Sequence, residues 1–406
     1  MKRNFNKYVI LCAIFALSAC GSNKDSSSQA SSSASESSSA SISKQLEFSE
    51  LQASTGTIYT DPQLNYLNSE NYADTTPYNG NMSVSAPKGK TLSWNYTGNF
   101  TPSGFIVNIY NDQELQDCIG TYSVETTEYI FFNEELDKTY YWNVSAEDFV
   151  SETASFTTGE QLIGPRNLYI DGVENARDLG GWTYFDEDSN TYRHYMKQGM
   201  IYRSGRFNKD KEDKVVSITE KGLYEVKQHL KFKTEIDLRR TSTNEVGGLT
   251  DKSVLGDDIN YIQLPMVFGG NNILTFKGEV SKDDFVYDNP ARIKDFFEIL
   301  AVEDNYPINF HCSIGKDRTG CLAYLIEGLL GFDQETMYRD YMFTNFANAG
   351  MCKLQEDILN RYGKTISDYD GDTVQEKVYK YLNEVIGVST TNLDSVINIL
   401  KLPDVE

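Results

Sequence analysis

The stretch NFHCSIGKDRTG, Asn309 to Gly320, constrains the fold more than any other part of this 406-residue chain. YPINF, which ends inside this stretch, is short and apolar, as expected for a buried strand. DRTGCLAYLIEGLLG, Asp317 to Gly331, repeats its apolar positions at helical spacing. The intervening residues, Cys312 to Lys316, are therefore expected to form a tight loop. A strand–loop–helix of this kind points several backbone N–H groups and a helix N-terminus at one place, which favours an anion.

Cys312 lies at the start of this loop, where a negative charge on sulfur would be stabilised. A free thiol, with a pKa of about 8.5, is mostly protonated at neutral pH, and converging N–H groups at a helix N-terminus lower that value. Arg318 begins the helix, and its planar guanidinium can bind two oxygens of one phosphate. The Thr319 hydroxyl could hydrogen-bond the sulfur, and His311 is expected to orient the loop. These residue types predict a nucleophile directed at phosphorus.

HCSIGKDRTG fits the pattern H-C-x5-R-[ST] and resembles the phosphate-binding loop of the cysteine-dependent phosphatases. GKDRTG is similar to a narrower branch, the atypical tyrosine and dual-specificity phosphatases of bacteria and fungi. The resemblance implies that Asp317 is the general acid and Lys316 an added phosphate contact, the alternative being helix capping and solvated charge. It also implies a set of phosphate-binding loop residues, namely Ser313, Ile314, Gly315, Lys316, Arg318 and Thr319.

Four further blocks resemble motifs of the same branch, in the same order along the chain. They are NARDLGG (Asn175–Gly181), IYRSG (Ile201–Gly205), IDLRRTSTNE (Ile236–Glu245) and RDYMFTN (Arg339–Asn345). In the third block the glutamate comes two residues later than the branch pattern has it, which puts the role of Glu245 in doubt.

Charged residues in these blocks are candidates for supporting roles. Asp237 and Arg239 follow a short apolar strand, where α/β folds place functional groups. Asp237 is the second candidate for general acid, and a structural pairing with Arg239 or Arg203 is equally open. Arg177 and Asp178 are expected to brace the loop through an ion pair rather than to touch the substrate.

The six cysteines form no C-x-x-C pair and no zinc-binding spacing. The phosphocysteine mechanism implied by the resemblance needs no metal, and no metal and no cofactor is expected. Cys321 and Cys352 are expected to be buried as small apolar residues. The alternative for Cys321 is a protective disulfide with Cys312.

The N-terminus resembles that of a bacterial lipoprotein. A basic start and the ten apolar residues Tyr8–Leu17 suit a signal peptide over residues 1–19 and are too short for a permanent membrane span. LSAC resembles a lipobox, which implies lipidation of Cys20; an ordinary secretory signal or an uncleaved anchor is the alternative. Thirteen of the twenty-two residues from Ser22 to Ser43 are serine, a composition typical of a flexible tether. No structure is predicted for residues 44–78.

Residues 79–160 show the short, alternating pattern of an all-β sandwich. TLSWNY, GFIVNIY, TTEYIFF and TYYWNVSA are rich in β-branched and aromatic residues, and polar turns separate them. In the last of these, Tyr140, Trp142, Val144 and Ala146 fall on one face. Trp94 and the LDKTYYWNVSA stretch resemble a fibronectin type III or immunoglobulin-like module, which we expect to be a spacer, with a surface-binding role as the alternative.

The predicted architecture is therefore a signal peptide (1–19), a tether with an uncertain segment (20–78), a β-sandwich (79–160) and an α/β cysteine-phosphatase domain (161–406). That last domain is expected to have a central, mostly parallel sheet flanked by helices. A lipid on Cys20 would hold the protein to the membrane outside the cytoplasm. The net charge of −22 argues against nucleic acid as a partner.

The predicted activity is hydrolysis of phosphomonoesters through a phosphocysteine intermediate. A phosphotyrosine protein is the first candidate substrate, with dual specificity open, and a phosphoinositide or inositol phosphate is the alternative. A catalytically silent phosphate-binding or adhesion lipoprotein is the second alternative. The sequence leaves the physiological substrate, the partner of the sandwich and the oligomeric state open.

Overall fold

The computed structural model describes residues 43–78, 86–159, 164–208, 217–240, 250–268, 273–280, 285–347 and 352–402. The predicted signal peptide, Cys20 and nearly all of the serine-rich tether lie outside these ranges, and so does Glu245. The predicted domain boundaries at residues 79 and 160 also fall outside them. Within the described ranges, no helix has the length and apolar character needed to cross a lipid bilayer.

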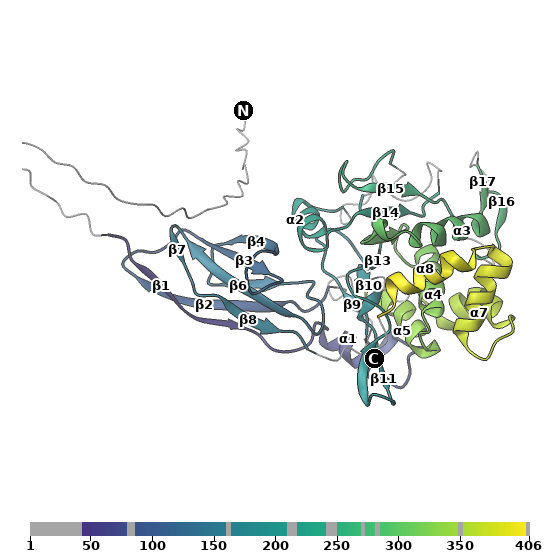
Figure 1. Cartoon of the computed structure of the whole chain (residues 1–406), viewed down its shortest axis with the longest axis horizontal. Helices are drawn as coiled ribbons and strands as arrows, with labels where there is room; N and C mark the ends of the chain where they lie inside the picture. The colour runs from purple at the N-terminus through teal and green to yellow at the C-terminus, as the bar shows by residue number, and fades with distance from the viewer. Residues whose placement is uncertain are drawn as a thin grey trace, which may run out of the picture. The chain divides into compact units, whose positions relative to one another are not determined.

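Two antiparallel sheets precede residue 160 (Figure 1). Their facing side chains share one hydrophobic core, in which Trp94 of one sheet lies 6.4 Å, ring centre to ring centre, from Trp142 of the other. Each sheet therefore buries its apolar face against the other. The first sheet has the order β1 (Leu46–Ala53), β2 (Lys90–Gly98), β5 (Glu128–Phe131), and the second has β4 (Cys118–Val124), β3 (Phe105–Tyr110), β6 (Thr139–Ala146), β7 (Phe149–Val150), with β8 (Ala154–Thr157) also paired to β6.

Four of these strands were predicted from sequence alternation. TLSWNY, GFIVNIY and TTEYIFF correspond to β2, β3 and β5, and TYYWNVSA is β6. The buried face predicted for β6 is confirmed, since Tyr140, Trp142, Val144 and Ala146 are all buried. Strand β1 lies in the segment without a prediction and pairs with β2. The likeness to a fibronectin type III module stays a prediction.

Between β1 and β2 the chain leaves the sandwich and packs on the C-terminal domain. This segment contains α1 (Asp61–Leu67) and η1 (Thr76–Tyr78). The ring of Tyr66 lies 5.7 Å from that of Phe346, and Arg339 donates a hydrogen bond to the Tyr66 carbonyl at 3.2 Å. The two domains are therefore joined by side-chain contacts as well as by the chain.

The C-terminal domain is built around a six-stranded sheet. Strand β18 lies between β14 and β13 and is parallel to both, β15 is parallel to β14, and the two short strands at the other edge are antiparallel. The predicted central, mostly parallel sheet is thus observed. Its order is β15 (Asn260–Gln263), β14 (Thr234–Asp237), β18 (Ile308–His311), β13 (Ile201–Ser204), β10 (Arg177–Asp178), β9 (Arg166–Asn167).

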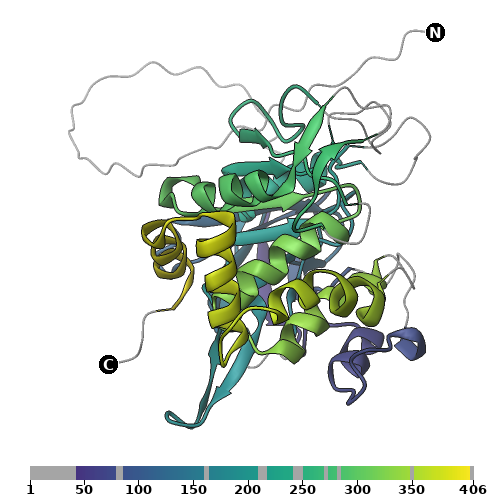
Figure 2. The same ribbon diagram turned by 90° about the vertical axis from the view of Figure 1, so that its right-hand side faces the viewer.

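Each face of this sheet is covered by its own apolar core. Along β13, Ile201 belongs to the larger core and Tyr202 to a separate cluster, because successive strand residues point to opposite faces. Figure 2 shows the green and yellow helices of the C-terminal half gathered together. The helices are α2 (Glu220–Tyr224), η4 (Glu225–His229), α3 (Asn289–Leu300), η5 (Glu303–Asn305), α4 (Asp317–Leu329), α5 (Gln334–Phe343), η6 (Thr344–Phe346), η7 (Leu354–Tyr362), α6 (Gly363–Ser367), α7 (Val374–Lys380), η8 (Tyr381–Ile386) and α8 (Thr390–Leu400). Short elements complete the domain: η3 (Leu179–Gly181), the hairpin β11 (Thr183–Asp186)–β12 (Thr191–His194) and the hairpin β16 (Lys277–Glu279)–β17 (Val286–Asp288).

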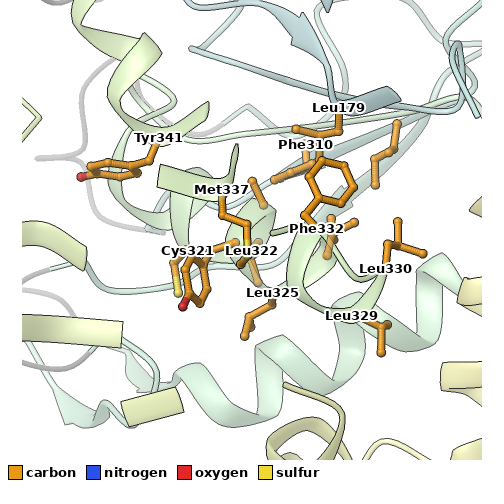
Figure 3. Packing of buried hydrophobic residues seen from close by; sticks show 14 of the residues in the cluster. Leu179, Phe310, Cys321, Leu322, Leu325, Leu329, Leu330, Phe332, Met337 and Tyr341 are labelled. Carbon is orange, nitrogen blue, oxygen red and sulfur yellow. The ribbon is translucent and has the colours of Figure 1, made fainter. Parts of the chain in front are cut away.

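Helix α4 is almost wholly buried, unlike a surface helix with one apolar stripe. Figure 3 shows Cys321, Leu322 and Leu325 of this helix among other core side chains. Cys321 and Cys352 are both buried, as predicted, and both are free thiols, as is Cys312. The helix that follows the phosphate-loop motif is thereby fixed in the centre of the domain.

Candidate active site

The predicted loop connects the end of β18 at His311 to the start of α4 at Asp317. Within it, Gly315 has φ = +72°, a left-handed conformation that favours glycine. A Cβ atom at this position would lie 2.6 Å from the carbonyl oxygen of Ser204 in β13. The loop therefore passes so close to its neighbouring strand that only glycine fits.

The carbonyl oxygens of Ser313, Ile314 and Gly315 are all held by side chains from outside the loop. The donors are Arg206 Nη1 to Ser313 (3.1 Å), Asn175 Nδ2 to Ile314 (3.0 Å) and Arg203 Nη2 to Gly315 (2.8 Å). In a trans peptide the N–H of the next residue points opposite to the carbonyl. The N–H groups of Ile314, Gly315 and Lys316 are therefore directed away from these donors and into the loop, as in an anion-binding nest.

Cys312 and Arg318 lie on either side of this loop, and both are 2 % exposed. Nη1 of Arg318 donates to the carbonyls of Leu238 (3.2 Å) and Met266 (3.3 Å), and Nη2 donates to Ser313 Oγ (3.3 Å). These bonds orient the guanidinium beside the loop. The ring of Phe268, which is 43 % exposed, lies 5.1 Å from its centre.

Thr319 and His311 are both fully buried; His311 directly precedes the predicted nucleophile, and Thr319 follows it by seven residues in α4. Nε2 of His311 lies 3.0 Å from Glu235 Oε1, and Nδ1 lies 3.3 Å from the carbonyl oxygen of Cys312. This arrangement fits the predicted orienting role. The Thr319 hydroxyl oxygen has no hydrogen-bond partner within the described part of the chain, and its bond to sulfur stays a prediction.

The two candidate general acids, Asp317 and Asp237, differ in the direction of their pKa shifts. Burial raises the pKa of the Asp317 carboxyl, and the nearby charge of Lys316 only partly offsets this effect. A carboxyl that keeps its proton closer to neutral pH suits an acid that must protonate a leaving oxygen.

Asp237 is instead fixed in an ion pair, one of the two structural pairings considered from sequence. Nη2 of Arg239 lies 2.6 Å from its Oδ2, and the Tyr261 hydroxyl donates to the same oxygen at 3.0 Å. Burial raises the pKa of Asp237, but His311 and Arg239 outweigh burial and lower it to about 2. A carboxylate of this kind has no proton to donate near neutral pH.

The prediction of an ion pair between Arg177 and Asp178 is wrong, because each residue pairs with a different partner. Arg177 Nε lies 2.9 Å from Asp340 Oδ1, whereas Asp178 Oδ2 lies 2.8 Å from Arg166 Nη2. The two residues are neighbours in β10, so their side chains point to opposite faces of the sheet. Asp340 also lies 2.6 Å from Nη1 of Arg203, so it holds both arginines behind the loop.

Among the described residues, Glu235, Asp237 and His311 come close enough together to share a metal ion. Both carboxylates already have partners, because Glu235 contacts His311 and accepts a hydrogen bond from Ser253, while Asp237 pairs with Arg239. The group therefore fits a buried brace beneath the loop.

Sequence reasoning missed six residues that surround the site. Asn175 and Asp340 lie inside two of the quoted motif blocks, so those blocks contained the signal for them. The other four lie outside those blocks, and the sequence around them contains no signal that places them beside the loop. The six are Asn175, Arg206, Phe268, Asp340, Asp357 and Arg361.

Residues 168–402, more than half of the chain, match the model of the tyrosine phosphatase family. A protein of Cupriavidus necator assigned by name to the tyrosine-protein phosphatases is 26% identical over 198 residues, which cover 46% of this chain and 66% of the relative. The chain thus spans just under two thirds of that protein.

Solved structures also match, among them the following two. The catalytic core of the PP-IP phosphatase SIW14 of S. cerevisiae is 19% identical, with 46% of this chain and 92% of that one covered and a TM-score of 0.28. TpbA of P. aeruginosa is 16% identical, with 53% and 94% covered and a TM-score of 0.23.

Proposed function

The chain belongs to the tyrosine phosphatase family, and on this premise we propose that it is a phosphatase that hydrolyses phosphomonoesters through a phosphocysteine at Cys312. The Cys312 sulfur attacks phosphorus and forms the S–P bond. The ester P–O bond breaks, and the leaving oxygen takes the proton of Asp317. Water then attacks phosphorus, the S–P bond breaks, and the proton released from water returns to Asp317.

One observation carries this proposal: three successive loop carbonyls are tied outward next to a buried cysteine. The inward N–H groups and the Arg318 guanidinium can stabilise the equatorial oxygens of the phosphoryl group as charge develops there. Because the donors are fixed before substrate arrives, little reorganisation is required at the moment of reaction. The intact set of Cys312, Asp317 and Arg318 favours turnover over a silent phosphate-binding protein.

The test compares Cys312→Ser with the unmodified full chain on p-nitrophenyl phosphate, with and without vanadate. We expect vanadate-sensitive release of phosphate that is lost in Cys312→Ser. Cys118→Ser is the matched control, because Cys118 is an exposed cysteine of β4 in the sandwich. Hydrolysis by Cys312→Ser at the unmodified rate would overturn the proposed mechanism.

For the substrate, we propose the phosphotyrosine side chain of a protein. The support is Phe268, an exposed ring beside the phosphate-binding Arg318, where it could pack on the aromatic part of a substrate. Inositol phosphates are the second candidate, favoured by Lys316 and Arg361, two cations beside the loop that could hold a further phosphate. Comparing kcat/KM for phosphotyrosine peptides, phosphoserine peptides and soluble inositol phosphates decides between these classes.

For the location, we propose an extracytoplasmic protein anchored through a lipid on Cys20. The support is the basic, apolar and LSAC sequence of the first twenty residues. Metabolic labelling with a fatty-acid analogue should mark the unmodified chain and not Cys20→Ser. Equal labelling of both chains would contradict lipidation at this residue.

A further inference from the structure

Four charged side chains form a closed ring at the N-terminus of α4, and two of them come from η7, outside the phosphate-loop motif. Nζ of Lys316 lies 3.8 Å from Asp317 Oδ1 and 3.2 Å from Asp357 Oδ2. Nη1 of Arg361 lies 3.5 Å from Asp317 Oδ1 and 3.5 Å from Asp357 Oδ1. Each cation is therefore shared between the same two carboxylates.

Asp357 is the most deeply placed member of this ring. Its side chain is 7% exposed, against 20% for Asp317 and 33% for Arg361. The backbone N–H of Lys353 donates to Asp357 Oδ2 at 2.9 Å, which fixes the carboxylate from the start of η7. Asp357 therefore cannot turn into solvent and stays opposite Lys316.

We propose that Asp357 and Arg361 are positioning residues for the general acid. Asp357 attracts the two cations of the ring and so weakens their hold on the Asp317 carboxylate, whereas Arg361 attracts that carboxylate and has the opposite effect. This inference rests on the proposed function, because it assigns the surroundings of the same acid. With Asp357 in place, Asp317 receives only part of the attraction of each cation and keeps its proton to higher pH. Without Asp357, both cations act on Asp317 alone and favour its ionised form.

The other groups that face Asp317 do not compete with the ring. Arg318, the next residue along α4, adds a constant positive charge. Burial raises the pKa of Cys321, Cys352, Tyr341 and Tyr362 well above neutral, so these side chains stay uncharged there. The effects on Asp317 agree with the geometry: burial raises its pKa, Lys316 lowers it, Asp357 raises it, and Arg361 and Arg318 lower it.

The test is the pH dependence of kcat/KM of the full chain on phenyl phosphate, whose poor leaving group needs the acid. The limb at higher pH reports loss of the Asp317 proton. Asp357→Asn should move this limb to lower pH by about one unit, and Arg361→Gln should move it to higher pH. Asp357→Asn should also lose more activity on phenyl phosphate than on p-nitrophenyl phosphate, whose better leaving group depends less on the acid.

Glu356→Gln is the matched control. It removes the same charge from the same helix, but its side chain is 65% exposed and pairs with Lys353 rather than with the ring. It should leave the limb in place. If Asp357→Asn fails to fold, Arg361→Gln carries the test, because its side chain is one-third exposed.

Shifts of the same sign in Asp357→Asn and Arg361→Gln would overturn the inference, and so would an unmoved limb in a folded variant. Either result would leave the proposed function intact if hydrolysis still required Cys312. Failure of the proposed function would appear instead as hydrolysis that survives Cys312→Ser.

Discussion

Arg203 donates a hydrogen bond from Nη2 to the carbonyl oxygen of Gly315 at 2.8 Å, while its Nη1 lies 2.6 Å from Asp340. A strand of the central sheet thus holds the backbone of the phosphate loop, and a buried carboxylate holds the arginine. The geometry of the loop therefore depends on a network of side chains behind it.

Arg203→Met should weaken phosphate binding more than it slows chemistry at saturation. The variant releases the Gly315 carbonyl, so the adjoining N–H groups no longer point steadily into the loop. It also removes one of the two arginines that contact Asp340, which should lower folding stability, while Arg177 still compensates the buried carboxylate. Vanadate affinity, KM and urea unfolding measure these effects. An unchanged vanadate affinity would show that the loop keeps its conformation without the hydrogen bond from Arg203.

Arg318→Lys should lower kcat by about 10²–10³-fold, with a smaller change in KM. A lysine keeps the charge but lacks the planar fork that binds two oxygens of the transferred phosphoryl group. It also cannot reproduce the bonds to both Leu238 and Met266. Steady-state kinetics on p-nitrophenyl phosphate test this prediction, with Arg292→Lys in a partly exposed ion pair of α3 as the control. A variant with full activity would remove Arg318 from the mechanism.

Phe268→Ala should raise KM for phosphotyrosine peptides several-fold and leave KM for inositol phosphates unchanged. The ring is exposed beside Arg318, and it contributes apolar contact area only when the substrate has an aromatic group. Equal losses on both substrate classes would indicate that Phe268 acts by holding Arg318 rather than by selecting the substrate.

Asp237→Asn should reduce stability but keep the leaving-group dependence of the reaction. The folded pKa of Asp237 is lowered from 3.8 to about 2, so its ionised form stabilises the fold above the unfolded value. This contribution, about 2 kcal/mol, is lost as pH falls from about 4 to about 2. The difference in unfolding free energy between Asp237→Asn and the unmodified chain should therefore shrink over this pH range.

As the control, Asp295→Asn breaks a partly exposed pair on α3 and should change stability by less than about 1 kcal/mol. If Asp237→Asn slowed the hydrolysis of phenyl phosphate much more than that of p-nitrophenyl phosphate, Asp237 would replace Asp317 as the proton donor. Rates on phenyl and p-nitrophenyl phosphate separate these outcomes.

Glu225→Ala should loosen the sandwich from the C-terminal domain. The buried Glu225 carboxylate accepts hydrogen bonds from Tyr122 at 2.9 Å and from Asn133 at 3.0 Å, both in the sandwich half of the chain. Removing it leaves buried donors without their acceptor, which costs about 1–3 kcal/mol each. Calorimetry should show two separated unfolding transitions in the variant. A single transition at the original temperature would contradict a role for Glu225 at this junction.

The sequence by itself determined the parts of this protein that are contiguous along the chain. The loop from Cys312 to Lys316 and the helix after it follow from local spacing, and so do the strands of alternating apolar residues. A β-turn, a helix start or an alternating strand is set by residues a few positions apart, so a single sequence contains its signal. The buried face of β6 could be predicted for the same reason, whereas the central, mostly parallel sheet was expected from the resemblance to the cysteine-dependent phosphatases.

Only the tertiary structure decided which distant residues act on the loop. Arg203 lies 112 residues from Gly315 along the chain, and Asn175 lies 139 residues from Ile314. Asp357 and Arg361 reach Asp317 from a separate helix. The tertiary structure also places the side chains of Arg177 and Asp178 on opposite faces of the sheet, because the two residues are neighbours in a strand. Partner choice at such distances depends on how the sheet and helices pack, and many charged residues of this chain could have met the loop equally well by sequence alone.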